Sequence, residues 1–274
     1  MSQVSAPNLQ VIATDRVALV TGAARGIGRA IALRLAADGF HVALNDLSKM
    51  SNELEKVKSE IESGFSNIRS CIIFADVSKQ NEVCEMVNKT VQELGRLDVM
   101  VANAGIQCTS PFLEATEEDF DRILNVNAKS VFFCYQEAAK QMIKQGHGGK
   151  LIGASSLSAH RPFKLGSLYA ISKWAVRGMT QAAALELAKH KINVNCYCPG
   201  AIDTDMFHDG SQAIAEQTGV KQDDIQRRIV HQWTAMERMG QPDDVAQCIS
   251  FLASQNSNFV TGQSLLIDGG IHYT

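Results

Sequence analysis

Val17-Ala-Leu-Val-Thr-Gly-Ala-Ala-Arg-Gly-Ile-Gly28 is the stretch that decides the fold of this chain. Its apolar first half predicts a buried strand, and a helix-forming segment follows directly. The three glycines permit a tight turn in which backbone N–H groups approach a pyrophosphate at the positive end of that helix. Their spacing is G-x-x-x-G-x-G, not the more common G-x-G-x-x-G. We expect the turn to bind a dinucleotide through Gly22, Arg25, Gly26, Ile27 and Gly28.

Short apolar segments alternate with longer helical ones along almost the whole chain. The apolar segments lack alternating polar residues, as in strands buried on both faces: residues 16–21, 41–45, 70–75, 99–102, 150–154, 192–198 and 264–267. Helical periodicity marks residues 28–38, 49–63, 79–94, 117–145, 167–190 and 242–253. This alternation implies parallel strands joined by right-handed crossovers. The expected fold is a single-domain α/β structure, a doubly wound, Rossmann-type, seven-stranded parallel sheet with helices on both faces.

Two segments stand outside this alternation. Residues 1–14 are expected to form a flexible arm, which leaves residues 15–274 as the dinucleotide-binding and catalytic domain. Residues 203–240 are mixed in character and contain Met206, Phe207 and Trp233. Because a long insertion beside a cleft often covers it, we expect a mobile substrate lid at about 203–240.

Composition and charge narrow the class of protein. Of the 274 residues, 45% are hydrophobic and 20% are charged, as in ordinary globular proteins. The net charge of −3 argues against a nucleic-acid partner and against an anionic membrane surface. No stretch approaches 18 apolar residues, and the first residues do not resemble a secretory signal. We therefore expect a cytoplasmic protein without a membrane span.

The cysteines do not indicate a disulfide framework. There are seven of them, at irregular spacings, and no His-rich segment has the spacing of a zinc site. Cys196 and Cys198 alternate within an apolar run, so they face the same side of a strand. We expect buried, reduced thiols and no bound metal.

Asp46 follows the second expected strand, where the adenosine ribose of a bound dinucleotide would lie. A carboxylate there accepts hydrogen bonds from the ribose hydroxyls and repels a 2′-phosphate, which favours NAD over NADP. Arg25 and Lys49 argue in the other direction, because either could reach a 2′-phosphate. We expect NAD as the cofactor, with NADP as the alternative.

Tyr169 and Lys173 lie four residues apart in a helical segment, so they share one face of that helix. A free tyrosine, with a pKa of about 10, is a poor acid or base near neutral pH. A neighbouring cation stabilises the phenolate and lowers that pKa. Lysine, together with a cationic nicotinamide ring, is expected to supply this effect.

Ser156 lies 13 residues before Tyr169, at the end of an apolar strand, where ligands bind in parallel sheets. A serine hydroxyl there can donate a hydrogen bond to a substrate oxygen while tyrosine handles the proton. Ser155 is its neighbour and competitor, and we expect its side chain to point elsewhere.

Together these residues resemble the short-chain dehydrogenase/reductase family. The motifs, in order, are Thr21-Gly22-x-x-x-Gly26-x-Gly28, Asn103-Ala104-Gly105, Ser156 and Tyr169-x-x-x-Lys173. The resemblance runs from about residue 15 to the C-terminus. It implies a catalytic tetrad of Asn127, Ser156, Tyr169 and Lys173, in which Asn127 holds a water of a proton relay. Without the family, Asn127 would be interpreted as a helix residue that satisfies a backbone group.

The resemblance also implies further cofactor contacts. Asp76 and Val77 are expected at the adenine, and Asn103 beside the cofactor and the central strand. The segment Pro199-Gly200-x-Ile202-x-Thr204 is expected around the nicotinamide. One departure is Ala102, where the family usually has asparagine before Asn103. The expected cofactor residues also include Ala104, Gly105, Tyr169 and Lys173.

Within the family the chain most resembles acetoin/diacetyl reductases and 2,3-butanediol dehydrogenases. Members usually carry glutamine directly after the catalytic serine and asparagine seven residues after it, but this chain has Leu157 and Phe163. A substrate hydroxyl left unpaired against this apolar wall costs about 1–3 kcal/mol. We therefore expect a secondary alcohol or ketone that is larger and more apolar than butanediol, of cyclic or terpenoid type. Its expected contacts are Ser156, Leu157, Phe163, Tyr169, Met206 and Phe207.

Several alternatives stay open. They are an acetoin/diacetyl reductase, an NADP-dependent carbonyl or polyol reductase, a 3-oxoacyl reductase, and a non-catalytic dinucleotide sensor with a protein partner. A sensor usually lacks the catalytic tyrosine or lysine, and both are present here. The resemblance further implies a homotetramer, with the long helices and the C-terminal strand at its interfaces.

Overall fold

The structure is a computed structural model, and it describes residues 15–273. The predicted arm at residues 1–14 lies outside the described part. The described chain forms a seven-stranded sheet, and every neighbouring pair of strands is parallel. The strands are β1 (Val17–Thr21), β2 (His41–Asp46), β3 (Ser70–Phe74), β4 (Val99–Ala102), β5 (Gly149–Ala154), β6 (Ile192–Pro199) and β7 (Ser264–Ile267). The predicted fold class is therefore confirmed.

The strand order positions the site. It runs β3-β2-β1-β4-β5-β6-β7, so the chain builds one half of the sheet outward from β1 and then returns to add β4 beside it. Connections leave β1 and β4 in opposite directions, which opens a crevice beyond the carboxyl ends of these two strands. The glycine turn of the sequence analysis leads out of β1 at this crevice.

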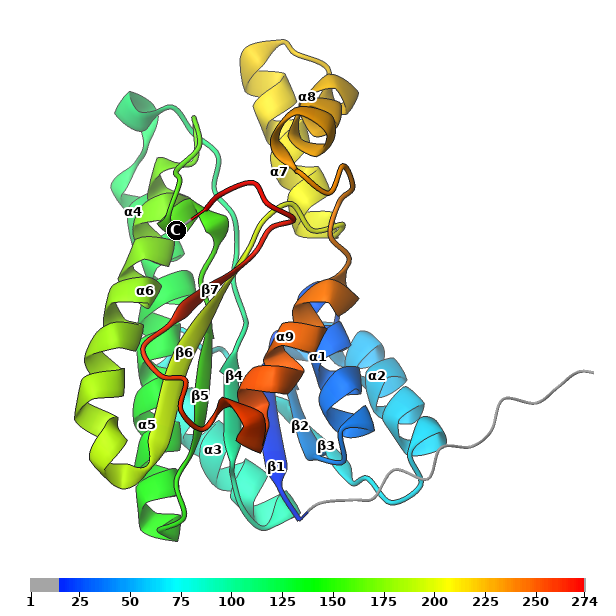
Figure 1. Ribbon diagram of the computed structural model, residues 1–274, viewed down its shortest axis with the longest axis vertical. Coiled ribbons are helices and arrows are strands. Elements are labelled where there is room, and N and C mark those ends of the chain that lie inside the picture. Colours follow the sequence, from blue (N-terminus) through cyan, green and yellow to red (C-terminus); the bar gives the residue numbers. More distant parts are fainter. Residues whose placement is uncertain (1–14, 274) are drawn as a thin grey trace, which may run out of the picture.

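Helices cover both faces of the sheet (Figure 1). One face packs against α1 (Gly26–Ala37), α2 (Ser51–Gly64) and α9 (Pro242–Ala253). The other face packs against α3 (Gln80–Leu94), α5 (Ser130–Gln145) and α6 (Ser167–Leu187). The strands between these two apolar layers are buried on both sides, which explains why β1 and β4 are continuous apolar runs.

The helix predicted over residues 117–145 is interrupted. It consists of α4 (Glu117–Leu124), a π-helical turn (Asn125–Lys129) and α5. Periodicity cannot distinguish a π turn from the α-helix around it, because the turn adds a single residue to one turn of a continuing helix. The prediction of one uninterrupted helix was therefore wrong at the position of Asn127.

The segment predicted as a lid is mostly helical. It contains α7 (Asp205–Thr218), α8 (Gln222–Arg228) and a π-helical turn (Ile229–Trp233), which Figure 1 shows beyond the carboxyl end of the sheet. The Thr204 hydroxyl caps α7 by accepting a hydrogen bond from the N–H of Phe207. The end of this segment is held beside the end of β6, because Gly240 forms an isolated β-bridge with Ile202, three residues after β6.

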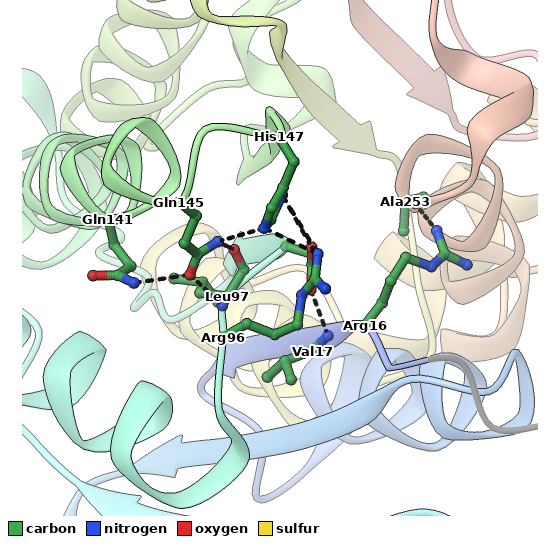
Figure 2. A network of polar contacts seen from close by, with 9 residues as sticks. Arg16, Val17, Arg96, Leu97, Gln141, Gln145, His147 and Ala253 are labelled. Carbon is green, nitrogen blue, oxygen red and sulfur yellow. Dashed lines mark hydrogen bonds and ion pairs between the residues drawn. The ribbon is translucent and has the colours of Figure 1, made fainter.

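A polar network closes the opposite, amino-terminal edge of the sheet. Asp98 accepts the N–H of Val17 at 2.9 Å and both arms of the Arg96 guanidinium at 2.8 and 2.7 Å. Gln145, at the end of α5, bonds both backbone groups of Leu97. Figure 2 shows Arg96, Gln145 and His147 converging there. These bonds fasten the start of β4 to β1 and α5, on the edge of the sheet away from the cleft.

None of the seven cysteines, all within the described range, is in a disulfide. Cys134, Cys196 and Cys198 are buried, as predicted. The prediction of burial was wrong for the other four, which are only partly covered: Cys71, Cys84, Cys108 and Cys248. In residues 15–273, no helix combines the length and the apolar character that a membrane span needs.

Candidate active site

A cleft of about 920 Å³ lies at the carboxyl end of the sheet, between the glycine turn and the α7–α8 segment. Every residue predicted to bind cofactor or substrate lines it, and of the predicted catalytic residues only Asn127 does not. The predicted residues that line it are Gly22, Arg25, Gly26, Ile27, Gly28, Asp46, Asp76, Val77, Asn103, Ala104, Gly105, Ser156, Leu157, Phe163, Tyr169, Lys173, Pro199, Gly200, Ile202, Thr204, Met206 and Phe207.

The glycine turn has the shape that a pyrophosphate requires. Gly22 has φ of +65°, and a Cβ there would lie 3.0 Å from the backbone of Ala104. A Cβ at Gly28 would collide with the Gly22 carbonyl and lie 2.6 Å from Nδ2 of Asn103. The first turn of α1 contains no acidic residue, and no side chain caps its N–H groups. These free N–H groups at the positive helix end fit a dinucleotide phosphate.

Asp46 ends β2 with its carboxylate fixed at the cleft. One oxygen accepts the N–H of Ala24 at 3.2 Å, and the other accepts the N–H of Leu47 at 2.9 Å. Arg25, the cation that argued for a 2′-phosphate, forms an ion pair with Asp205 at 2.7 Å. Lys49 also lines the cleft. This end of the site therefore presents one oriented carboxylate and two cations, of which Arg25 is already paired with Asp205.

Asn103 connects three strands beneath the cleft. Its Nδ2 donates to the Thr21 carbonyl at 2.9 Å, and its N–H donates to the Thr21 hydroxyl at 2.9 Å. Its Oδ1 accepts the Tyr197 hydroxyl at 2.8 Å. Because the Asn103 side chain joins β1, β4 and β6, the amide that the motif supplies holds the floor of the cleft in place.

Tyr169, Lys173 and Ser156 come together from α6 and from the end of β5. The Lys173 ammonium lies 5.4 Å from the centre of the Tyr169 ring and donates to the Ala154 carbonyl at 2.9 Å. The Ser156 hydroxyl accepts the N–H of Ser158 at 3.1 Å, which orients it at the strand end. These three side chains, which lie up to 17 positions apart in the sequence, therefore share one corner of the cleft.

Burial governs the ionisation of this corner. It lowers the pKa of Lys173 from 10.5 to about 8. It also raises the pKa of the Tyr169 phenol, although the hydrogen bond with Ser156 opposes that rise. The predicted lowering of the Tyr169 pKa requires Lys173 together with the cationic nicotinamide ring, so for the cofactor-bound protein it stays a prediction. Desolvation of the partly covered phenol raises its pKa, and burial destabilises the charge of the neighbouring amine.

Ser155 points away from the cleft corner, as predicted. Its hydroxyl donates to the Lys173 carbonyl at 2.9 Å and so braces α6 against β5. The neighbouring Ser156 is left to face Tyr169.

Asn127 lies behind the cleft wall, fully buried in the π turn. Its side-chain amide donates to the Ile106 carbonyl and accepts the Ile106 N–H, both at 2.8 Å. A Cβ at Gly105 would lie 3.2 Å from Oδ1 of Asn127 and 3.5 Å from Nζ of Lys173. Asn127 therefore satisfies backbone groups, as expected from the sequence without the family, within a few ångströms of the Lys173 amine.

The far end of the cleft is largely apolar. Leu157, Phe163, Met206 and Phe207 line it, and the Phe163 ring centre is 6.4 Å from that of Tyr169. The Arg161 guanidinium lies 5.4 Å over the Trp233 ring, which connects the loop after β5 to the end of the α7–α8 segment.

Sequence reasoning missed several residues of this end. They are Ile106, Gln107, Arg161, Lys164, Gly210, Ile214, Val220, Ile229 and Ile271. The sequence could have indicated Gln107, because it comes two residues after the Asn103-Ala104-Gly105 motif. No feature of the sequence indicates Ile271, since only the return of the chain after β7 brings it to the cleft.

Comparisons with family models, known proteins and solved structures all find similar proteins. A family model described as enoyl-(acyl carrier protein) reductase matches residues 22–272. A short-chain dehydrogenase/reductase of Armillaria gallica is 47% identical over 260 residues, covering 95% of this chain and 97% of the relative. An L-2,3-butanediol dehydrogenase of Corynebacterium glutamicum is 41% identical, covering 94% of this chain and 99% of the relative.

Among solved structures, levodione reductase superimposes with a TM-score of 0.87 at 31% identity, covering 94% of this chain and 98% of that one. On the sequence motifs, the sheet topology and these matches, the chain belongs to the short-chain dehydrogenase/reductase family.

Proposed function

We propose that this protein is an oxidoreductase that interconverts a secondary alcohol and a ketone with NAD(H), on a substrate larger and more apolar than butanediol. The observation that carries the proposal is the corner formed by Ser156, Tyr169 and Lys173 at the end of β5. A hydroxyl, a phenol and an amine around one point can bind and protonate a carbonyl oxygen. The matching butanediol dehydrogenase and levodione reductase support the same reaction class.

Each residue of the corner has a proposed role. Ser156 donates a hydrogen bond to the substrate oxygen, and Tyr169 gives it a proton in reduction or takes one in oxidation. Lys173, with a pKa lowered to about 8 by burial, supplies positive charge beside the phenol and passes the proton between the phenol and solvent, inward in reduction and outward in oxidation. Asn127 holds the loop at Ile106 and orders the relay behind the lysine. When bound, the nicotinamide supplies or accepts the hydride, and its oxidised ring adds positive charge.

Asp46 supports NAD as the cofactor. Its carboxylate, oriented by two backbone N–H groups, can accept hydrogen bonds from two ribose hydroxyls and repels a 2′-phosphate. The ion pair with Asp205 also makes Arg25 less available to bind such a phosphate. Asp76 and Val77 are proposed at the adenine, and residues 199–204 around the nicotinamide.

The apolar wall supports a larger substrate. Leu157 and Phe163 stand where polar residues would hold a small diol, and Trp233 adds an aromatic face to the proposed lid. A cyclic or terpenoid-type alcohol would bury its body against these side chains. An acetoin or diacetyl reductase is the second candidate, favoured by relatives that carry that name, such as the diacetyl reductase of Staphylococcus epidermidis, 40% identical.

We also propose a cytoplasmic homotetramer. Large apolar side chains stay exposed on the long helices, with Phe132 on α5 49% exposed and Leu185 on α6 84% exposed. Phe259, just before the C-terminal strand, is fully exposed. Such side chains on helices that already pack on the sheet fit subunit contacts.

The decisive experiment is a steady-state comparison of NAD and NADP with small diols and with bulky cyclic alcohols. We expect kcat/KM to be at least about tenfold higher with NAD, and higher for the bulky alcohols. A preference for NADP would contradict the role of Asp46, and a preference for butanediol would favour the second candidate. Cofactor binding without turnover of any alcohol or ketone would indicate a sensor.

A further inference from the structure

Gln107 is a polar side chain at the substrate end of the cleft that the proposed reaction does not use. It lies on the loop after β4, half-buried, and it lines the cleft. Among residues 15–273, no group hydrogen-bonds its side-chain amide. An amide has two donor hydrogens and an accepting oxygen, and leaving them unpaired in a dry site costs free energy.

The backbone that carries Gln107 is held in place. The preceding residue, Ile106, has both its N–H and its carbonyl bonded to Asn127 at 2.8 Å. Gly105, two residues before Gln107, is so close to the catalytic corner that a Cβ there would lie 3.5 Å from Nζ of Lys173. Gln107 therefore follows directly on a backbone segment that is fixed beside the catalytic corner, so its own backbone has little freedom to shift.

The other side of Gln107 is packed against the proposed lid. Gly210 is buried in α7, and a Cβ there would collide with the Gln107 amide nitrogen and lie 2.7 Å from its Cδ. Only a glycine at this position leaves room for the amide against the helix backbone. The Gln107 side chain is thus confined between the catalytic loop and α7, which pre-organises its amide at low entropic cost.

The surroundings make this amide selective. Leu157, Phe163 and Ile214 line the same cleft and form no hydrogen bonds through their side chains, and Ile214 lies one helical turn after Gly210 on α7. A substrate oxygen placed at this end can pair with an amide, whereas a hydrocarbon group there leaves the amide unpaired. A site built in this way discriminates against the analogue that lacks the oxygen.

We propose that Gln107 is a specificity-determining residue that hydrogen-bonds a second oxygen of the substrate, away from the reacting carbon. The inference rests on the proposed function and narrows its substrate class. The substrate has an apolar body and carries a second hydroxyl or carbonyl group in addition to the reacting one. Leu157 and Phe163 then enclose the body, while Gln107 recognises the second oxygen.

The test compares ketones that differ only in that second oxygen. Cyclohexanone, 2-hydroxycyclohexanone and 4-hydroxycyclohexanone are reduced with NADH by the wild type, by Gln107→Leu and by Gln217→Leu. Gln217 is an exposed glutamine of α7 that does not line the cleft, so its substitution is the matched control. The measured quantity is the ratio of kcat/KM for the better hydroxyketone to that for cyclohexanone within each enzyme, so changes in total activity cancel.

We expect the wild type and Gln217→Leu to favour a hydroxyketone, and the ratio to fall at least about tenfold in Gln107→Leu. A ratio that Gln107→Leu leaves unchanged, with cyclohexanone still reduced, overturns this inference and leaves the proposed function standing. If the folded wild type binds NADH but reduces none of the three ketones or a wider panel, the proposed function itself fails.

Discussion

Tyr169 and Lys173 show, at the scale of single residues, how burial sets the chemistry of a side chain. Their spacing in the sequence places them on one helix face, but it does not indicate how much water surrounds them. The structure buries Lys173 and covers part of Tyr169, so the pKa of the phenol rises and the pKa of the lysine falls to about 8. An amine with a pKa near 8 can release and regain a proton close to neutral pH, a property that sequence spacing alone did not reveal.

The substitution Tyr169→Phe tests the acid–base role. Loss of the hydroxyl removes the proton donor but keeps the ring that packs near Phe163, so we expect at least a ~100-fold loss of kcat. NADH binding, measured by fluorescence titration, should change less than about threefold. Ser155→Ala is a suitable comparison, because Ser155 faces the α6 backbone. Near-normal turnover by the phenylalanine variant would exclude Tyr169 as the acid.

Asp46→Ser tests the cofactor preference. The serine removes the charge that repels a 2′-phosphate and shortens the acceptor, so kcat/KM with NADP should rise relative to NAD by at least about tenfold. Asp209→Ser, an exposed change on α7 outside the cleft, should leave that ratio as in the wild type. If the two variants give the same ratio, Asp46 does not select the cofactor.

At the scale of elements, two interruptions of regular structure shape the site. The π turn at Asn125–Lys129 directs Asn127 inward to bond both backbone groups of Ile106. The glycine at position 210 lets α7 lie directly against Gln107. Neither feature can be identified from helical periodicity alone, because a single π turn only shifts the phase of the apolar pattern and a buried glycine leaves that pattern intact.

The substitution Gly210→Ala separates stability from specificity at α7. Alanine in a helix is more favourable than glycine by about 0.5–1 kcal/mol, and its methyl group meets only the flexible end of Gln107. We expect an unchanged or slightly raised Tm, together with a lower preference for hydroxyketones, because the amide must move. A lowered Tm with an unaltered preference would mean that Gly210 serves packing alone.

At the scale of the whole molecule, the two edges of the sheet differ in character. The cleft lies where the strands have their carboxyl ends, and polar networks close the side where the strands have their amino ends. One of them centres on Lys150 in β5, which is 8% exposed. Its ammonium donates to Asn193, Ser257 and Asn258 at 2.8–3.2 Å and so ties β5 to β6 and to the turn after α9. All three acceptors are uncharged, so burial is not compensated and lowers the pKa of Lys150 to about 8.

This lysine predicts a pH dependence of stability. Below pH 8 Lys150 is protonated in both states, and the folded state bears the full cost of its buried charge. Between pH 8 and about 10.5, the unfolded chain holds the proton and the folded chain releases it, so stability rises with pH. From this group alone, the free energy of unfolding should rise by about 1–2 kcal/mol between pH 8 and 10.

Urea unfolding of the wild type and of Lys150→Met at both pH values measures the effect. The variant should lose that part of the rise, whereas Lys56→Met, on the exposed side of α2, should keep it. The buried tyrosines and cysteines, whose raised pKa values favour unfolding as the pH approaches 10, are the same in all three proteins, so their effect cancels when the slopes are compared. Equal slopes for all three proteins would show that Lys150 titrates normally.

The sequence by itself determined the sheet, its parallel strands, the glycine turn and the family. Each of these follows from local spacing: apolar runs of strand length, glycines at a strand–helix junction, and Tyr169 four residues before Lys173. Only the tertiary structure decided which groups share the cleft wall, such as Gln107 with Gly210, and which buried groups lack a charged partner, such as Lys150. Contacts and desolvation of this kind join segments far apart in the chain, and their energies depend on packing that no local pattern of residues encodes.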